Sequence, residues 1–127
     1  MKTILVDAIH AFIIVGKGIF TEMQELLDSY PNPKIILTGA TDEQIIAFGL
    51  DHVPYPVFTL RRQPEKADPL YYKKMLEHFT LTAADVVYFE HNAEAVESAR
   101  SVGITTYHYD KDKKDLVALK EFLDANL

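Results

Sequence analysis

The sequence predicts an α/β fold in which a parallel sheet is covered by helices on both faces. Short apolar, β-branched runs alternate along the chain with stretches that have the 3.6-residue period of an amphipathic helix. Gly, Pro and helix-capping residues separate nearly all of these segments. Such regular alternation is typical of a doubly wound, Rossmann-like sheet, and we expect five parallel strands.

Composition narrows the class of protein further. The chain has 127 residues, of which 48% are hydrophobic and 25% are charged, so we expect one soluble globular domain over residues 1–127. Its formal net charge is −6 without a basic block, so neither nucleic acid nor an anionic membrane is an expected partner. There is no cysteine, which excludes disulfides and thiolate chemistry. Asp7 and His10 interrupt the apolar N-terminal run, so we expect a cytoplasmic protein rather than a signal peptide.

The first half of the chain supplies three of the predicted strands and two helices. The strands are expected at residues 3–9, 34–37 and 57–60. The first helix is expected to begin with a capping box at Thr21 and Gln24, and the second with a capping box at Thr41 and Gln44.

The second half supplies the remaining strands, at residues 86–89 and 104–107. A helix with apolar residues on one face follows Asp68-Pro69. Asn92 is the expected N-cap of the next helix, and Gly103 suits the position just after its end. Asp112 is the expected cap of the last helix.

Residues 66–109 carry the most specific pattern. Lys66 precedes Asp68-Pro69 and a helix, and the following strand ends at Glu90-His91 before the helix that Asn92 opens. This order and spacing resemble the C-terminal half of the haloacid dehalogenase (HAD) superfamily, whose usual phrase is a Lys-Pro-Asp-Pro helix followed by a strand that ends in two aspartates.

The resemblance implies a magnesium-dependent phosphohydrolase site. Asp7 matches the aspartate that attacks phosphorus, Thr38 the residue that holds a phosphoryl oxygen, and Lys66 the lysine that neutralises charge. Glu90 and His91 stand where the family has its magnesium-binding acidic pair. Ligands of open α/β sheets bind beyond the carboxyl ends of the strands, so these residues are also expected to meet there on topological grounds.

Two residues depart from the family pattern. Ile9 stands where family phosphatases have a second aspartate that serves as general acid and base, and this help is typically worth a factor of about 10²–10⁴. Neutral His91 is a poor ligand for Mg²⁺, which prefers oxygen. We therefore expect weak Mg²⁺ binding and a degenerate site with weak or lost activity. His10 would replace the missing acid and base only if the strand bends after Asp7.

The predicted domain has no cap. Residues 8–37 leave room for a loop and one helix, and residues 39–65 for one helix and one strand. A site without a cap is open to solvent unless something covers it. We therefore expect a phosphorylated small molecule as ligand and a second copy or another protein as a cover, to which the apolar loop 11–20 contributes. Arg61 and Arg62 are expected at the surface.

Two further functional classes fit a doubly wound sheet. A non-catalytic module that binds a phosphate ligand or a protein on the same fold is the alternative to an enzyme. A phospho-receiver domain is excluded because its acceptor follows the third strand, with an acidic pair after the first. Here the candidate acceptor Asp7 follows the first strand, and no acidic pair accompanies it.

Overall fold

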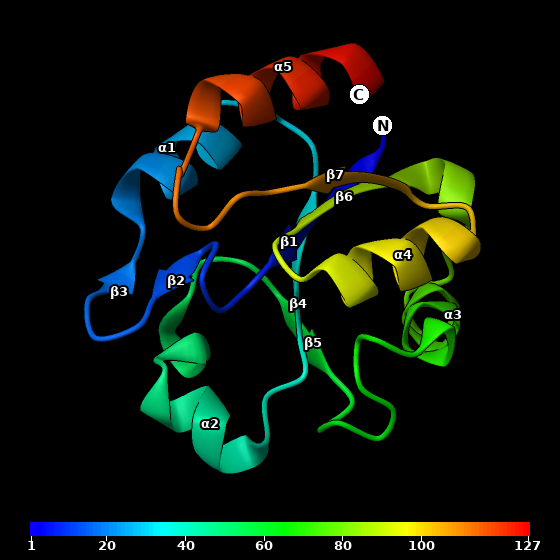
Figure 1. The fold of residues 1–127 in the computed structure, drawn as a ribbon, viewed down its shortest axis with the longest axis horizontal. Coiled ribbons are helices and arrows are strands. Elements are labelled where there is room, and N and C mark those ends of the chain that lie inside the picture. The colour runs from blue at the N-terminus through cyan, green and yellow to red at the C-terminus, as the bar shows by residue number, and fades with distance from the viewer.

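The computed structural model describes residues 1–127 and contains a five-stranded parallel sheet in the order β5-β4-β1-β6-β7 (Figure 1). Its strands are β1 (Thr3–Asp7), β4 (Lys34–Thr38), β5 (Val57–Thr59), β6 (Val86–Glu90) and β7 (Thr105–His108). The chain runs from β1 outward to β4 and β5, then returns to the other side of β1 for β6 and β7. The predicted five-stranded Rossmann-like sheet is therefore confirmed, and its strand order reverses at β1.

Strand β1 lies at the centre of the sheet and ends at the candidate nucleophile. All five of its residues are buried, as expected for a parallel strand that is covered on both faces. Asp7 is paired in register with Leu37 of β4, and Val6 with Phe89 of β6. The carboxyl ends of these three neighbouring strands therefore lie side by side, which brings Thr38 and Glu90 to the two sides of Asp7.

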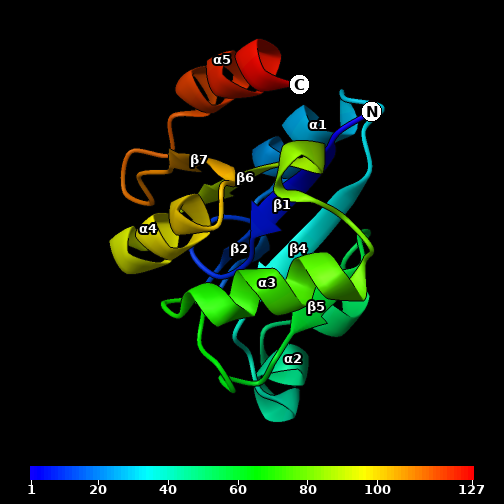
Figure 2. The same cartoon turned by 90° about the vertical axis from the view of Figure 1, so that its right-hand side faces the viewer.

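Helices cover both faces of the sheet. Figure 2 shows α1 (Thr21–Asp28) and α5 (Leu116–Asn126) on one face, with α3 (Pro69–His78) and α4 (Ala93–Ser101) on the other. Side chains along β1 alternate between these layers: Ile4 and Val6 pack in the α1–α5 core, whereas Leu5 packs in the α3–α4 core. No helix is both long enough and apolar enough to cross a membrane.

The capping signals in the sequence place three helix ends correctly. Thr41 and Gln44 form the predicted capping box at the start of α2 (Asp42–Ala47). The Asn92 side chain accepts a hydrogen bond from the Ala95 amide at 3.0 Å and so caps α4. Gly103 follows α4 with φ of +91°, a conformation that glycine adopts without strain.

Two predicted caps are wrong. Helix α1 has Phe20 as its N-cap without a side-chain hydrogen bond, so Thr21 is its first helical residue. At the last helix, Asp115 accepts from the Ala118 amide at 3.0 Å and is the N-cap of α5. Asp112 lies in the preceding turn, where its own amide donates to Asp110. Both Asp residues precede the apolar residues of the last helix, so the sequence pattern fits either one as the N-cap. The tertiary position of the chain determines which of them caps α5.

The apolar residues that follow β1 form a hairpin instead of the expected loop. Strands β2 (Ile13–Ile14) and β3 (Gly18–Ile19) pair antiparallel. The chain turns between them through Gly16 with φ of +83°. The hairpin, α1, β4, α2 and the short 3₁₀ helix Leu50–His52, with their short connections, make up the chain between β1 and β5, so no cap is inserted, as predicted.

Two buried tyrosines give opposite predictions for stability. The Tyr109 hydroxyl is buried and has no hydrogen-bond partner, whereas the Tyr88 hydroxyl donates to Glu90. Removing an unpaired buried hydroxyl relieves its desolvation cost, so Tyr109→Phe should raise the free energy of unfolding by about 1 kcal/mol. Tyr88→Phe leaves a carboxylate short of a donor and should lower it by roughly 1–3 kcal/mol. Urea unfolding of both variants checks the pair, and equal effects would show that the two hydroxyls have equivalent surroundings.

Candidate functional site

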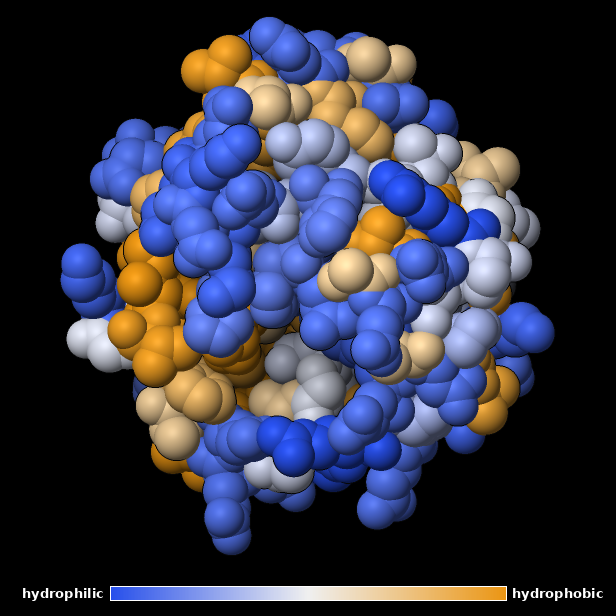
Figure 3. All heavy atoms as spheres, viewed as in Figure 1, coloured by the Kyte–Doolittle hydropathy of each residue, from blue (hydrophilic) through white to orange (hydrophobic).

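A pocket of about 500 Å³ opens at the carboxyl end of the sheet. Figure 3 shows a hollow in this face, with a hydrophilic rim and more hydrophobic side chains on its floor and on its left-hand side, where the β2–β3 hairpin lies. All of the residues that the sequence singles out for the site line this pocket, namely Asp7, Thr38, Lys66, Glu90 and His91. They come from the ends of β1, β4 and β6 and from the loop before α3.

The centre of the pocket is a buried ion-pair cluster. The Lys66 ammonium lies 2.9 Å from Asp7 Oδ1 and 2.6 Å from Glu90 Oε1, so it bridges the two carboxylates. The ammonium also donates a hydrogen bond to the Leu37 carbonyl at 3.2 Å. The Asp7 and Glu90 side chains are each 1% exposed, which makes an unpaired charge at either position very costly. Lys66 therefore holds the site together by two ion pairs and by two directed hydrogen bonds.

His91 forms the second positive corner of the cluster. Its Nδ1 is in hydrogen-bond contact with Asp7 Oδ2 and lies 3.2 Å from Glu90 Oε2. Its backbone amide also donates to Asp7 Oδ2, at 3.0 Å. The second oxygen of Asp7 is thus held twice by one residue, and the ring is turned toward both carboxylates.

Hydrogen bonds from neighbouring residues fix the orientation of the cluster. Tyr88 donates its hydroxyl hydrogen to Glu90 Oε1, and the Asn92 amide donates to Glu90 Oε2 at 3.0 Å. The Ser98 hydroxyl of α4 donates to the Ala67 carbonyl, which fastens the loop that carries Lys66. Each oxygen of Glu90 therefore has two polar partners: Oε1 contacts Tyr88 and Lys66, and Oε2 contacts Asn92 and His91. These contacts hold the Glu90 side chain in one orientation.

Burial and neighbouring charges set the protonation of the cluster. Burial would raise the pKa of Glu90, but the Lys66 ammonium and the bonds to His91 hold that pKa well below its usual range. Burial and then the Glu90 charge raise the pKa of Asp7, and Lys66 opposes them. Burial lowers the pKa of the His91 ring, yet its contacts with the two carboxylates raise it to about 9. Asp7 is therefore the weaker acid of the two, and the ring is an imidazolium at neutral pH.

Thr38 and two backbone amides supply uncharged donors at the pocket. The Thr38 hydroxyl oxygen accepts from the Ala40 amide at 3.1 Å, which leaves its hydrogen free to donate. Tyr71 donates to the Thr38 carbonyl at 2.8 Å and fixes the end of β4. The amides of the pocket-lining residues Ile9 and Gly39 donate to no group of the chain. Unpaired amides beside a pocket are potential donors for an anion.

The positions after Asp7 supply no evident proton carrier. Ile9 is half-buried and lines the pocket. His10 has φ of +73° and is exposed, so the chain does bend after β1. However, His10 lines a separate hollow next to Lys111 and Asp112, and its ring meets the His91 ring edge-on at 5.2 Å between centroids. The role of His10 as a substitute acid and base stays a prediction.

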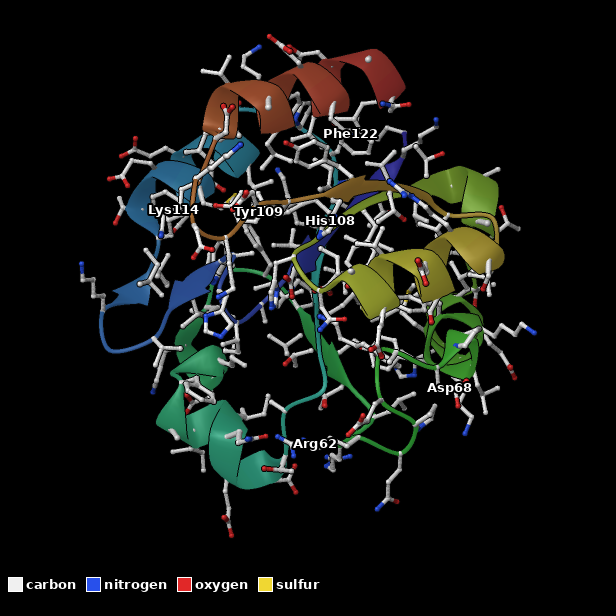
Figure 4. All side chains as sticks on the ribbon, viewed as in Figure 1. Arg62, Asp68, His108, Tyr109, Lys114 and Phe122 are labelled. Atoms are coloured by element: carbon white, nitrogen blue, oxygen red, sulfur yellow. The ribbon has the colours of Figure 1, made fainter.

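Several rim residues were not singled out from the sequence as site residues. Arg62, labelled in Figure 4 beside α2, lines the pocket although a plain surface position was expected, and Glu65 lies near it. Glu94 and Gln44 line other parts of the rim. A usable signal exists for Glu94, because it falls in the first turn of the helix that starts directly after the β6 end. Arg61, by contrast, pairs with Asp42 on the surface at 2.7 Å.

Three residues of the pocket have the side-chain types that bind metal ions. Asp7, Glu90 and His91 each offer one ligand atom, these atoms lie within 4.8 Å of one another, and such a group could hold a metal ion. Mg²⁺ requires a near-octahedral set of oxygens. Here all four carboxylate oxygens already accept bonds from Lys66, His91, Tyr88 or Asn92, and the third ligand atom is a protonated ring nitrogen. The arrangement therefore does not fit Mg²⁺ as it stands.

Comparison with solved structures identifies the fold. An uncharacterised protein from Listeria monocytogenes serotype 4b has a TM-score of 0.73 at 14% identity, with 98% of each chain covered. A HAD-superfamily hydrolase of subfamily IA from Geobacter sulfurreducens has a TM-score of 0.62 at 14% identity, with 94% of this chain and 99% of that chain covered. A conserved haloacid dehalogenase-like protein of unknown function from Agrobacterium tumefaciens has a TM-score of 0.59 at 15% identity, with 84% of this chain and 62% of that chain covered.

This chain thus has the fold of the HAD-superfamily hydrolases, in a form without a cap domain. The resemblance predicted from residues 66–109 is confirmed for the fold. No protein-family profile matches the sequence, and no curated protein is detectably similar to it. At these identities the likeness concerns the fold alone, and the chemistry has to be argued from the residues of the pocket.

The charged state of His91 gives a prediction for stability against pH. Its pKa is raised from 6.5 to about 9 on folding, so the stabilisation is complete below about pH 6.5 and is lost as pH rises through 9. The loss should be on the order of 2 kcal/mol, because the ring is partly exposed and solvent screens its contacts. Urea unfolding between pH 6 and 10 measures it, with His91→Asn as the matched variant. Parallel pH curves for the two proteins would contradict a shifted His91.

Proposed function

We propose that the chain is a HAD-like, phosphohydrolase-related domain that binds phosphate esters at the Asp7 pocket and hydrolyses them only weakly. The observation that carries the proposal is the convergence of Asp7, Thr38 and Lys66 on one open pocket at the carboxyl end of a parallel sheet. A carboxylate that is aimed by Lys66 has the position of a nucleophile. The free Thr38 hydrogen, unpaired amides and Arg62 at the rim are donors suited to phosphoryl oxygens.

The expected chemistry would proceed in two steps. An oxygen of Asp7 attacks phosphorus, the bond to the ester oxygen breaks, and the departing alkoxide takes a proton. Water then attacks the aspartyl phosphate, which returns the carboxylate and releases phosphate. Both steps need a proton carrier, and Ile9 at the pocket wall cannot serve. Both oxygens of Asp7 are also held by Lys66 and His91, which reduces their nucleophilicity.

The same geometry bears on cofactor and partners. Mg²⁺ binding through Asp7 and Glu90 is expected to be weak, since an ion must displace Lys66 and His91 from carboxylates that they already neutralise. A phosphorylated small molecule remains the proposed ligand. The pocket is open, so a second copy or another protein is the proposed cover, and the exposed Val15 at the tip of the β2–β3 hairpin is suited to touch it.

Hydrolysis of a generic aryl phosphate tests the proposal directly. We expect turnover to be barely above background with or without Mg²⁺, because no side chain is placed to move the proton. Inorganic phosphate should nevertheless bind the wild-type protein, as measured by calorimetry. Robust turnover that disappears in Asp7→Asn would show a competent enzyme, and lack of phosphate binding would remove the proposed ligand class.

A repair of the pocket should restore activity. Ile9→Asp places a carboxylate at the half-buried pocket wall, and His91→Asp supplies a second acidic residue beside Glu90. The double variant should exceed the parent in Mg²⁺-dependent phosphatase activity by at least about tenfold, a small part of the usual general acid–base contribution. Circular dichroism must show that the double variant folds, and Ile9→Asn with His91→Asn is the control. A folded double variant without any gain would favour the non-catalytic binding module on this fold.

A further inference from the structure

The His91 ring stands between the two buried carboxylates of the pocket. Its Nδ1 contacts Asp7 Oδ2 by a hydrogen bond and lies 3.2 Å from Glu90 Oε2. An ion that bridged these carboxylates would need to bind between the same oxygens. Because Nδ1 and Asp7 Oδ2 are in direct contact, no space for an ion remains between them. The ring therefore occupies the bridging position itself.

The charges of the cluster are balanced without a metal. Asp7 and Glu90 contribute two negative charges and Lys66 one positive charge. The His91 ring, held with Nδ1 against both carboxylates, contributes the second positive charge when it is protonated. A carboxylate at position 91 would change this balance from zero to −2, a deficit equal to the charge of one divalent ion. Histidine at this position thus does electrostatically what a divalent cation would do beside an acidic residue.

We propose that His91 replaces a divalent cation in this pocket, so that the site binds a phosphate-type anion without metal and presents His91 Nε2–H to it. The identity of the anion rests on the proposed function, whereas the replacement of the metal does not. His91 lines the pocket, its side chain is 20% exposed, and its Nε2 has no partner in the chain. The Lys66 ammonium is already occupied by hydrogen bonds to Asp7 and the Leu37 carbonyl and by its ion pair with Glu90. Nε2–H is consequently the charged donor of the inner cluster that is free to meet a ligand.

Calorimetry with Mg²⁺, Mn²⁺ and Zn²⁺ tests the replacement without reference to any ligand. Wild type and His91→Asn should both bind each ion weakly, whereas His91→Asp should bind Mg²⁺ at least about tenfold more tightly than wild type, an increase of about 1.4 kcal/mol. Tight binding of any of the ions to wild type that is lost in His91→Asn would make His91 a ligand and overturn the proposal. Equal Mg²⁺ affinity of wild type and a folded His91→Asp would overturn it as well.

Inorganic phosphate tests the anion site. Its affinity for wild type should be the same, within about twofold, in EDTA and in excess Mg²⁺. His91→Asn should lose about tenfold in EDTA, the worth of one charge-assisted hydrogen bond, while His91→Lys keeps the cation and should retain most of the affinity. A wild-type affinity that rises tenfold or more with Mg²⁺ would overturn the proposal even if no variant folds. If wild type binds no phosphate in either buffer, the proposed function fails, and the metal titrations alone decide the role of His91.

Discussion

The buried ion pair between Lys66 and Asp7 is the interaction on which the rest of this site depends. A carboxylate that is 1% exposed at the end of a central strand would be strongly destabilising without a positive partner. That partner is Lys66, which lies 59 positions along the chain in the loop before α3. The ion pair therefore forms only when this loop lies at the carboxyl end of β1. The bond from Ser98 to the Ala67 carbonyl then ties this loop to α4, on the other side of the strand-order reversal.

The same pair lies between a buried floor of the pocket and an exposed rim. Behind Lys66 lie buried aromatic side chains of α3 and β6, and Tyr71 and Tyr88 direct their hydroxyls at the ends of β4 and β6. In front of it, Arg62 and Glu65 are exposed on a loop. A buried, hydrogen-bonded floor with exposed rim residues suits a small anionic group that is held deeply and a variable remainder that stays near solvent. This division supports a phosphate ester as ligand more than an extended protein segment in the pocket itself.

Much of this could be predicted from sequence because it follows from local rules and from strand topology. Asp7 is the single charged residue in its strand. Because the carboxyl ends of parallel strands meet at one edge of the sheet, the proximity of Asp7 to Thr38 and Glu90 follows from the order of the strands. The β2–β3 hairpin could not be predicted, since each strand has two residues and is held by tertiary packing. The choice of Asp115 over Asp112 as the N-cap of α5 could not be predicted either, because it depends on where α5 packs against the rest of the fold.

The role of His91 lies beyond sequence patterns for a different reason. Taken alone, histidine after a strand indicates a metal ligand, a proton carrier or a backbone partner equally well. What distinguishes these roles is the direction of Nδ1 and the number of free lone pairs on Asp7 and Glu90, and both are tertiary facts. The two departures from the HAD pattern, Ile9 and His91, then have related consequences. A pocket whose own imidazolium and ammonium neutralise its carboxylates can hold an anion, but with no acid and base at position 9 it has little means to break the ester bond. The two residues together therefore support the proposal of anion binding with weakened turnover.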